Sequence, residues 1–571
     1  MSKNFKIIFV GITLLVTPVF VSAVSLGQEV NFFVKSDYDS FQREEISATL
    51  KTIGEKAYFY VDNKWWDILD SQKKERVEQS LRILDSEFHN RIYPKLTTIF
   101  GSEWIPGIDN DLRITILIHP MKGGVGGYFN SGDEYPRLQV PNSNQKEMVY
   151  LNANQIDNPQ LKAFLAHEFM HLITFNQKDK IQGISEETWL NEARSEYAPT
   201  LLGYDDEYEG SNLQRRVSDF LAKPSDSLTE WKNEKADYGI LNLFTQYLVE
   251  HYGAKVLIDS LKLKTVGIES LNQALAQNYF EEDFSQIFTD WTIAIFVNDC
   301  SLGEKYCYKN ENLKEIRVTP SINFLPLHGK STLGVSQTTK NWAGNWHKFI
   351  GGKGVLKFEF SSLAELNFKV PYLVQDKEGK YSIYFLTLDK NQKGEIYIQD
   401  FNTENKSLTI IPSLQTKISG FDGPDPTYPF TFTVSILERT PEEEAELIKE
   451  LLAQIEFLKA EIVRLQAQIN AILVERGQQQ GVAPCRFETD LYFGMMNNDE
   501  VRCLQEFLKA QGPEIYPEAL VTGNFLTLTK TAAIRFQEKY ANEILSPLGL
   551  EKGTGFFGPS TRTKINQLLG Y

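Results

Sequence analysis

A helix-patterned run over residues 161–175 carries the pentapeptide His-Glu-Phe-Met-His, which constrains this chain more than any other feature. Residues four apart share one face of a helix, so His167 and His171 can offer two imidazole nitrogens to one metal ion. Glu168 stands beside the first histidine, where a general base can reach a metal-activated water. Apolar residues occupy the other faces, as in a helix buried in a core: Phe164, Leu165, Phe169, Leu172 and Ile173. For the pentapeptide alone, a solvated helix with two unrelated histidines is the alternative.

A second motif, Asn-Glu-Ala-Arg-Ser-Glu, follows at residues 191–196. A catalytic zinc site with two histidines needs a third protein ligand from another element. The two motifs together resemble the gluzincin metallopeptidases, the thermolysin-like superfamily. This resemblance implies an α+β thermolysin-like metallopeptidase domain with one catalytic Zn2+ and Glu192 as the third ligand. It also implies that Asn191 and Glu196 orient the histidines.

The sequence around the two motifs is similar to the hyicolysin family of secreted bacterial metallopeptidases, over about residues 30–310. The segments that carry this similarity before the zinc helix include Ala57–Val61, Ile92–Lys95, Ile114–Pro120, Gly126–Phe129 and Ser143–Asn152. Two short apolar runs bounded by turn residues, 114–118 and 148–151, predict strands.

A further short segment between these runs predicts an edge strand: Gly126, Gly127, Tyr128 and Phe129. In thermolysin-like enzymes such an edge lies along the cleft and pairs with the substrate backbone. A flexible turn at the glycine pair is the alternative.

Tyr238 is the candidate donor to the oxyanion of the tetrahedral intermediate, because its counterpart in related gluzincins opens a helix after the third ligand. The run over residues 236–253 has helical periodicity, and Gly253 is placed as its C-cap. His251 is expected to bind carbonyl groups near the helix end. Tyr247 and Tyr252 are expected to be core or rim aromatics.

The sequence favours an endopeptidase over an exopeptidase. Gluzincin aminopeptidases carry a Gly-x-Met-Glu-Asn-like strand whose glutamate binds the free amine of the substrate. The nearest segment here, Lys146–Val149, does not match it.

The chain has 571 residues, which predicts several domains, and its formal charge of −16 argues against nucleic acid as a partner. Residues 1–23 have the pattern of a secretory signal peptide, with cleavage expected after Ala23. An uncleaved anchor is the alternative. We therefore expect a secreted protein, extracellular or associated with the bacterial cell wall, with a metallopeptidase domain over residues 24–315. Residues 24–40 are a candidate inhibitory segment.

Four cysteines fit an exported protein. Of the three possible connectivities, pairing Cys300 with Cys307 and Cys485 with Cys503 closes the shortest loops. Two acidic segments, 205–209 and 422–425, are possible calcium sites, although solvated loops are the expected account.

Residues 316–438 predict a β-sandwich domain, because short runs of alternating apolar residues are separated by turns. The runs are Val355–Phe360, Tyr381–Leu386, Glu395–Gln399, Leu408–Ile411 and Phe430–Ile436.

Residues 439–477 predict a coiled-coil helix. Its heptad seam comprises Ile448, Leu451, Ile455, Leu458, Ile462, Leu465, Ile469 and Ile472. Isoleucine at a positions and leucine at most d positions favour a parallel homodimer through residues 448–472. A trimer, or a helix that folds back on its own chain, is the alternative.

Residues 478–571 resemble the peptidoglycan-binding domain of bacterial wall enzymes, a small all-α module. Repeated apolar-Gln and Thr-Gly-x-Phe elements carry this resemblance, with Leu526 where that family usually has another glycine. A helical bundle used for protein contact is the alternative. The whole sequence thus predicts a multidomain, wall-associated zinc endopeptidase that acts on polypeptides. A hydrolase of peptidoglycan stem peptides and a catalytically inactive adhesion or scaffold protein are the alternatives.

Overall fold

The computed structural model describes residues 24–325, 331–421, 423–437, 441–475 and 485–571. It contains two compact units, Met1–Glu450 and Leu451–Tyr571, and each is described by itself. The predicted signal peptide and the linker at 477–481 lie outside the described residues. Within the described part of the chain, no helix combines the length and the hydropathy needed to cross a membrane.

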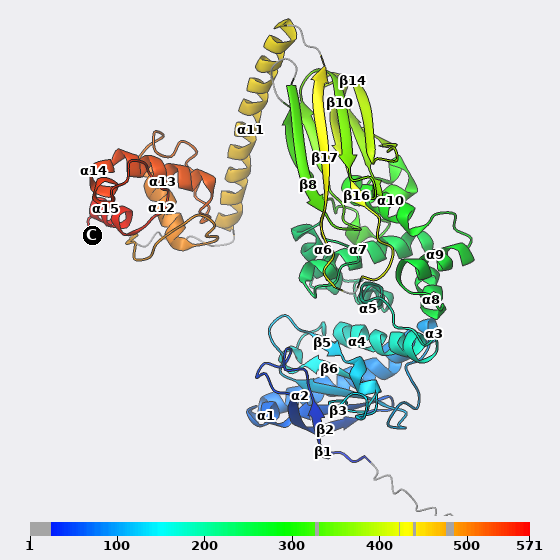
Figure 1. Cartoon of the computed structure of the whole chain (residues 1–571). Helices are drawn as coiled ribbons and strands as arrows, with labels where there is room; N and C mark the ends of the chain where they lie inside the picture. Colours follow the sequence, from blue (N-terminus) through cyan, green and yellow to red (C-terminus); the bar gives the residue numbers. More distant parts are fainter. Residues whose placement is uncertain (1–23, 326–330, 422, 438–440, 476–484) are drawn as a thin grey trace, which may run out of the picture. The chain divides into compact units, whose positions relative to one another are not determined.

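A six-stranded sheet begins the first unit, in the order β1-β2-β3-β4-β6-β5 (Figure 1). Its strands are β1 (Glu29–Phe33), β2 (Glu45–Ile53), β3 (Ala57–Asp62), β4 (Ile114–His119), β5 (Gly127–Phe129) and β6 (Met148–Asn152). β3, β4 and β6 are parallel, and every residue in them is buried. Burial on both faces explains why the sequence shows continuous apolar runs here rather than alternation. The two strands predicted at 114–118 and 148–151 are confirmed.

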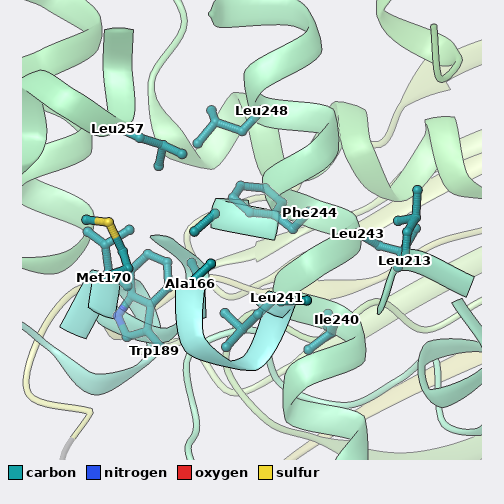
Figure 2. Packing of buried hydrophobic residues seen from close by; sticks show 14 of the residues in the cluster. Ala166, Met170, Trp189, Leu213, Ile240, Leu241, Leu243, Phe244, Leu248 and Leu257 are labelled. Carbon is teal, nitrogen blue, oxygen red and sulfur yellow. The ribbon is translucent and has the colours of Figure 1, made fainter. Parts of the chain in front are cut away.

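Ten helices follow or flank this sheet in the first unit before its second group of strands. They are α1 (Asn63–Asp67), α2 (Ser71–Glu87), α3 (Tyr93–Phe100), α4 (Leu161–Phe175), α5 (Thr188–Leu201), α6 (Asn212–Ala222), α7 (Lys235–Tyr252), α8 (Ala254–Lys262), α9 (Gly267–Gln277) and α10 (Phe284–Val297). One buried cluster joins Ala166 and Met170 of α4, Trp189 of α5 and Phe244 of α7 (Figure 2). This shared core fixes the helix of the first motif against the helix of the second.

Nine strands of the first unit form a second sheet. Two short strands in the same stretch of sequence, β11 and β16, form a separate two-stranded ladder. Together these strands are β7 (Ser321–Leu325), β8 (Ser331–Thr339), β9 (His347–Gly351), β10 (Gly354–Ser362), β11 (Phe368–Lys369), β12 (Pro371–Asp376), β13 (Tyr381–Phe385), β14 (Lys393–Phe401), β15 (Asn405–Ile410), β16 (Ser413–Leu414) and β17 (Tyr428–Leu437). β14 and β15 are joined through one residue pair only. Phe349 of β9 packs against Phe358 of β10 and Phe432 of β17, so side chains from both parts of the sheet share one core.

This strand region packs on the helices of the same unit. Trp342 contacts Phe284 and Phe288 of α10, with ring centroids 4.8 and 5.4 Å apart. Trp346 donates its indole N–H to the carbonyl of Thr292 at 2.9 Å. These buried aromatic contacts explain why the two regions form one compact unit.

Both predicted disulfides are present, Cys300–Cys307 in the first unit and Cys485–Cys503 in the second. A single helix, α11 (Pro441–Glu475), occupies the predicted coiled-coil segment. Its seam residues from Ile448 to Ile469 include six that are at least 38% exposed. Self-association through this seam stays a prediction.

The second unit ends in four short helices: α12 (Asp499–Ala510), α13 (Thr527–Lys539), α14 (Ala541–Ile544) and α15 (Pro559–Leu569). Gln505 accepts from the backbone N–H groups of Thr522 and Gly523 and donates to Thr529. Gln537 repeats the pattern, since it accepts from Gly555 N–H and donates to Thr561. The two buried glutamines therefore explain the repeated apolar-Gln and Thr-Gly-x-Phe elements: each one ties a helix to the turn that opens the next.

A buried pair of carboxyl groups makes the stability of the first unit depend on pH. Glu134 is fully buried and Glu147 is 3% exposed. Burial and the adjacent Glu147 carboxyl raise the pKa of Glu134 above its ordinary value of 4.5. The folded chain keeps this proton, whereas the unfolded chain releases it near pH 4.5. The contribution of this pair to the free energy of unfolding is therefore fully present below pH 4.5 and falls as the pH rises above it.

Glu134→Gln should remove this pH dependence. The carboxamide NH2 can donate a hydrogen bond to Glu147 at any pH, whereas a carboxyl group donates only when it is protonated. We expect the thermal midpoint of the variant to rise by roughly 2–4 °C at pH 8 and to equal that of the parent at pH 4. Calorimetry at the two pH values measures this. An equal shift at both values would show that the pair does not share a proton.

Candidate metal centre

Two helices bring three ligand atoms to one point. α4 supplies His167 and His171, and the first half of α5 supplies Glu192. The two histidine Nε2 atoms are 3.2 Å apart, and Glu192 Oε2 lies 3.3 Å from His167 Nε2 and 3.6 Å from His171 Nε2. Among the residues that the structure describes, these three are the only group of at least three His, Cys, Asp or Glu arranged to hold a metal ion.

The other nitrogen of each ring is already engaged. His167 Nδ1 lies 3.3 Å from Glu196 Oε1, and His171 Nδ1 lies 3.0 Å from Asn191 Oδ1. Both partners are acceptors, so each ring carries its proton on Nδ1 and presents a lone pair at Nε2. Two lone pairs and the Glu192 carboxylate therefore face one another, an arrangement that a cation stabilises.

The spacing of these atoms fits zinc. Zinc–nitrogen bonds of about 2.0–2.1 Å in a tetrahedron place neighbouring ligand atoms about 3.3–3.4 Å apart. The three separations given above lie close to this value. Glu192 Oε2 is also buried without a hydrogen-bond donor, which is the state expected of a carboxylate oxygen reserved for a cation.

Buried charged residues fix the position of the candidate metal ligands. Arg216 donates to both oxygens of Glu196, at 2.6 and 2.8 Å. Burial alone would raise the pKa of Glu196, but Arg216 and then His167 outweigh it and hold that pKa well below its usual range. Burial likewise opposes the charged form of His167, but Glu192 and Glu196 prevail and raise its pKa to about 10. Protons therefore compete with a metal ion for Nε2 of His167.

The centre lines a cleft of about 600 Å³. β5 lies at the edge of its sheet and runs beside α4. A Cβ atom on Gly127 would lie 2.6 Å from Tyr150 O and 3.0 Å from Glu168 Cγ, and one on Gly126 would lie 2.9 Å from the Phe164 ring. Both glycines are thus required for close approach of strand and helix.

The backbone of β5 is oriented toward the cleft. Gly127 pairs with Leu151 and Phe129 with Val149 in an antiparallel ladder, and Asn152 N–H donates to Gly126 O. Inward and outward hydrogen-bonding groups alternate along such a ladder. Gly127 and Phe129 therefore direct their N–H and C=O groups to the free edge. Strand formation starts at Gly127, one residue later than the predicted segment.

Tyr238 lies in the cleft wall, with its ring centroid 6.5 Å from that of His167. Burial raises its pKa far above the ordinary value, so its phenol stays protonated. His251 Nε2 donates to the Cys307 carbonyl at 2.9 Å rather than to a carbonyl at the end of its own helix. Tyr247 is fully buried, and Gly253 caps α7 as predicted.

Several residues of the site were not singled out from the sequence. Ser195 Oγ lies 3.2 Å from His171 Nδ1, and the Asn242 side chain donates to Glu196. Arg216 lies in α6, which falls between the second motif and α7 in the sequence. Tyr38 enters the cleft from a segment far away in the sequence. Ser195 was the one member inside a motif, where the Asn-Glu-x-x-Ser-Glu pattern is a usable signal.

In the possible calcium segment 205–209, the structure gives no support for a cation at Asp205. Asp205 uses both carboxylate oxygens inside the fold, accepting from Leu213 N–H and Thr200 Oγ1. The segment 422–425 includes residue 422, which lies outside the described residues.

Comparison with known proteins finds a relative among the metalloproteases. The chain is 25% identical over 296 residues to the neutral metalloprotease ShpI of Staphylococcus hyicus, a match that covers 47% of this chain and 62% of that protein. The chain thus spans less than two thirds of the relative's length. No family model matches.

Comparison with solved structures adds no argument about the fold. The pre-peptidase C-terminal domain of a Bacillus anthracis collagenase has a TM-score of 0.15 at 4% identity, covering 20% of this chain and 94% of that domain. The lysozyme inhibitor PliG of Salmonella Typhimurium also has a TM-score of 0.15, at 12% identity, covering 21% of this chain and all of that protein. The similarity to a metalloprotease therefore rests on the sequence match and on the ligand geometry above.

We expect one zinc ion per chain in the purified protein and in Glu168→Gln, because Glu168 is not among the three converging ligands. Glu192→Gln should weaken zinc binding beyond the roughly 10–100-fold that loss of an outer partner costs. Metal analysis and competition with a chromophoric chelator measure this. Glu209→Gln, an exposed carboxylate outside the cleft, is the matched control. Equal zinc content in Glu192→Gln and the control would contradict the assignment.

Asn191→Ala removes the acceptor that fixes the His171 ring. We expect zinc affinity to fall about 10–100-fold while the fold is kept, since the ligand itself remains. The same chelator competition, run beside a circular dichroism spectrum, gives the answer. Unchanged affinity would show that Ser195 alone orients the ring.

Proposed function

We propose that this chain is a zinc-dependent endopeptidase. The observation that carries the proposal is the convergence of His167, His171 and Glu192 beside a free carboxylate, Glu168, at the edge strand of a cleft. The similarity to a neutral metalloprotease over about half of the chain supports it. Zinc held by the three ligands would supply Lewis acidity toward water and a carbonyl oxygen.

Glu168 is the proposed general base. It follows His167 directly on α4, and its Cγ lies against the backbone of Gly127. Burial raises the pKa of Glu168, while His167 and His171 oppose that shift. A carboxylate in this position takes the proton of the attacking water and later passes it to the leaving amine.

The orientation of β5 supports substrate binding at its free edge. An extended peptide can add to the free edge of the sheet through Gly127 and Phe129, with its scissile bond beside Glu168. Phe129 also stacks on His171, with ring centroids 6.2 Å apart, so it bounds one end of the site. Pairing along the free edge of β5 suits an internal segment of an extended chain.

Secretion and attachment to the cell wall are the second part of the proposal. The two disulfides support an oxidising compartment. The glutamine-centred repeat of the second unit supports a peptidoglycan-binding role for that module. Pairing of α11 between two copies would place two catalytic units on one wall-bound dimer.

Zymography tests the proposal. The full chain should clear casein, a chelator should abolish clearing, and zinc should restore it. Glu168→Gln should lower turnover by at least about 10²-fold while keeping its zinc, because the base alone is lost. Retained activity in this variant would show that another group is the base.

Purified cell wall, used as a second substrate, separates the two alternatives. Clearing of wall but not of casein would indicate a hydrolase of peptidoglycan stem peptides. Zinc binding without hydrolysis of either substrate would indicate an adhesion or scaffold protein that keeps the metal for stability.

A further inference from the structure

Tyr38 is a cleft residue that the proposed mechanism does not use. It lies between β1 and β2, about 130 positions before the zinc helix in the sequence, yet it lines the same cleft as His167 and Glu192. Its ring packs against that of Tyr128, with centroids 5.0 Å apart. It falls within the segment 24–40, for which the sequence suggested an inhibitory role.

The segment around Tyr38 is held by buried charge. Asp39 is fully buried, and its carboxylate accepts from the Arg43 guanidinium and lies 3.1 Å from His119 Nδ1. Burial would raise the pKa of Asp39, but His119 and Arg43 lower it below its ordinary value. Arg43 also pairs with Asp62 of β3 at 2.5 Å. This segment is therefore anchored to the sheet rather than resting loosely in the cleft.

Backbone hydrogen bonds fix the position of Tyr38 itself. Lys122 N–H donates to the Tyr38 carbonyl at 2.9 Å, and Ser40 N–H donates to the Pro120 carbonyl at 3.1 Å. These bonds attach the segment to the chain that leads into β5. The phenol thus enters the cleft beside the proposed substrate strand, from the sheet side.

A hydrogen-bonded chain crosses the cleft from Tyr238 to Tyr38. The Tyr238 hydroxyl donates to Asn233 Oδ1 at 2.7 Å, and Asn233 Nδ2 donates to the Tyr38 hydroxyl at 3.3 Å. Asn233 has a φ of 61°, a left-handed conformation that asparagine tolerates better than most residues. Its amide therefore has one acceptor end and one donor end between the two phenols.

Counting protons distinguishes the two tyrosines. A phenol has a single proton to donate. Tyr238 gives its proton to Asn233, whereas Tyr38 receives a hydrogen bond from the same amide and keeps its own proton uncommitted. Burial, and the nearby carboxylates of Glu192 and Glu168, raise the pKa of Tyr38, so this proton is retained at neutral pH.

We propose that Tyr38 is a catalytic residue that donates a hydrogen bond to the carbonyl oxygen of the scissile peptide as negative charge develops there. This inference rests on the proposed endopeptidase function. Asn233 acts as a positioning residue, since it holds the Tyr38 hydroxyl from one side and binds the Tyr238 proton on the other. Tyr238, the donor expected from the sequence, then shapes the cleft and supports Asn233.

The test compares Tyr38→Phe with Tyr238→Phe on a quenched fluorescent peptide that the parent enzyme cleaves. Loss of one preorganised oxyanion donor lowers kcat by about 10²–10³-fold. We expect a loss of that size in Tyr38→Phe with KM changed less than about twofold, and a loss below about tenfold in Tyr238→Phe. Tyr208→Phe, a tyrosine outside the cleft, is the matched control.

Binding gives a readout independent of turnover. A phosphonamidate peptide carries a tetrahedral anionic group, so its affinity for Tyr38→Phe should fall in proportion to kcat/KM. The affinity of a product peptide should stay within about twofold of the parent value. Asn233→Ala should lower kcat in the parent background but have little further effect in Tyr38→Phe, because the two residues act as a unit.

The outcomes separate this inference from the proposed function. If the parent enzyme cleaves peptides and needs Glu168, but Tyr38→Phe keeps kcat within twofold or becomes more active, Tyr38 is no donor. If no peptide is cleaved by the parent, the proposed function itself fails. Zinc content and thermal midpoint of each variant are measured first. If Tyr38→Phe does not fold, a fluorotyrosine at position 38 replaces it, and the alkaline limb of kcat must then move to lower pH.

Discussion

The centre depends on two imidazole rings whose Nδ1–H groups are directed away from each other by acceptors. Glu196 fixes the ring of His167, and Asn191 fixes that of His171. Because both protons are placed on the outer nitrogens, the inner nitrogens and Glu192 present only electron pairs to one another. Such a group is unfavourable in a buried site without a cation, so the second motif matters as much as the histidines.

Support for this centre extends well beyond the ligands. Glu196 is a buried carboxylate, and Arg216 compensates its charge through two short hydrogen bonds. Removing one partner of such a pair leaves an uncompensated buried charge, which costs more than the pair itself contributes. The core shared by α4, α5 and α7 keeps these elements in register. The same helices form the cleft wall, so packing and chemistry are constrained by the same side chains.

Local pattern predicted much of the molecule. The helix of the first motif, the strands near residues 114 and 148, five strands of the second sheet and both disulfides follow from periodicity, composition and cysteine spacing. The other four strands of that sheet, β7, β8, β9 and β12, were not predicted. Their side chains are buried by residues of neighbouring strands, and a single run of sequence does not show which strands will be neighbours. The arrangement of the strands as one connected nine-stranded sheet likewise depends on long-range pairing.

By itself, the sequence placed His167 and His171 on one helix face, because residues four apart share a face whatever the rest of the fold does. Glu192 as a third ligand came from the family resemblance. The orienting roles of Asn191 and Glu196 followed from family resemblance, and the tertiary structure added the charge of Arg216 and the hydroxyl of Ser195. Only tertiary structure decided that Tyr38 shares the cleft. No local period links a loop between two early strands to a helix so far along the chain. Their proximity is set by sheet pairing and by the buried charges of Asp39 and Arg43.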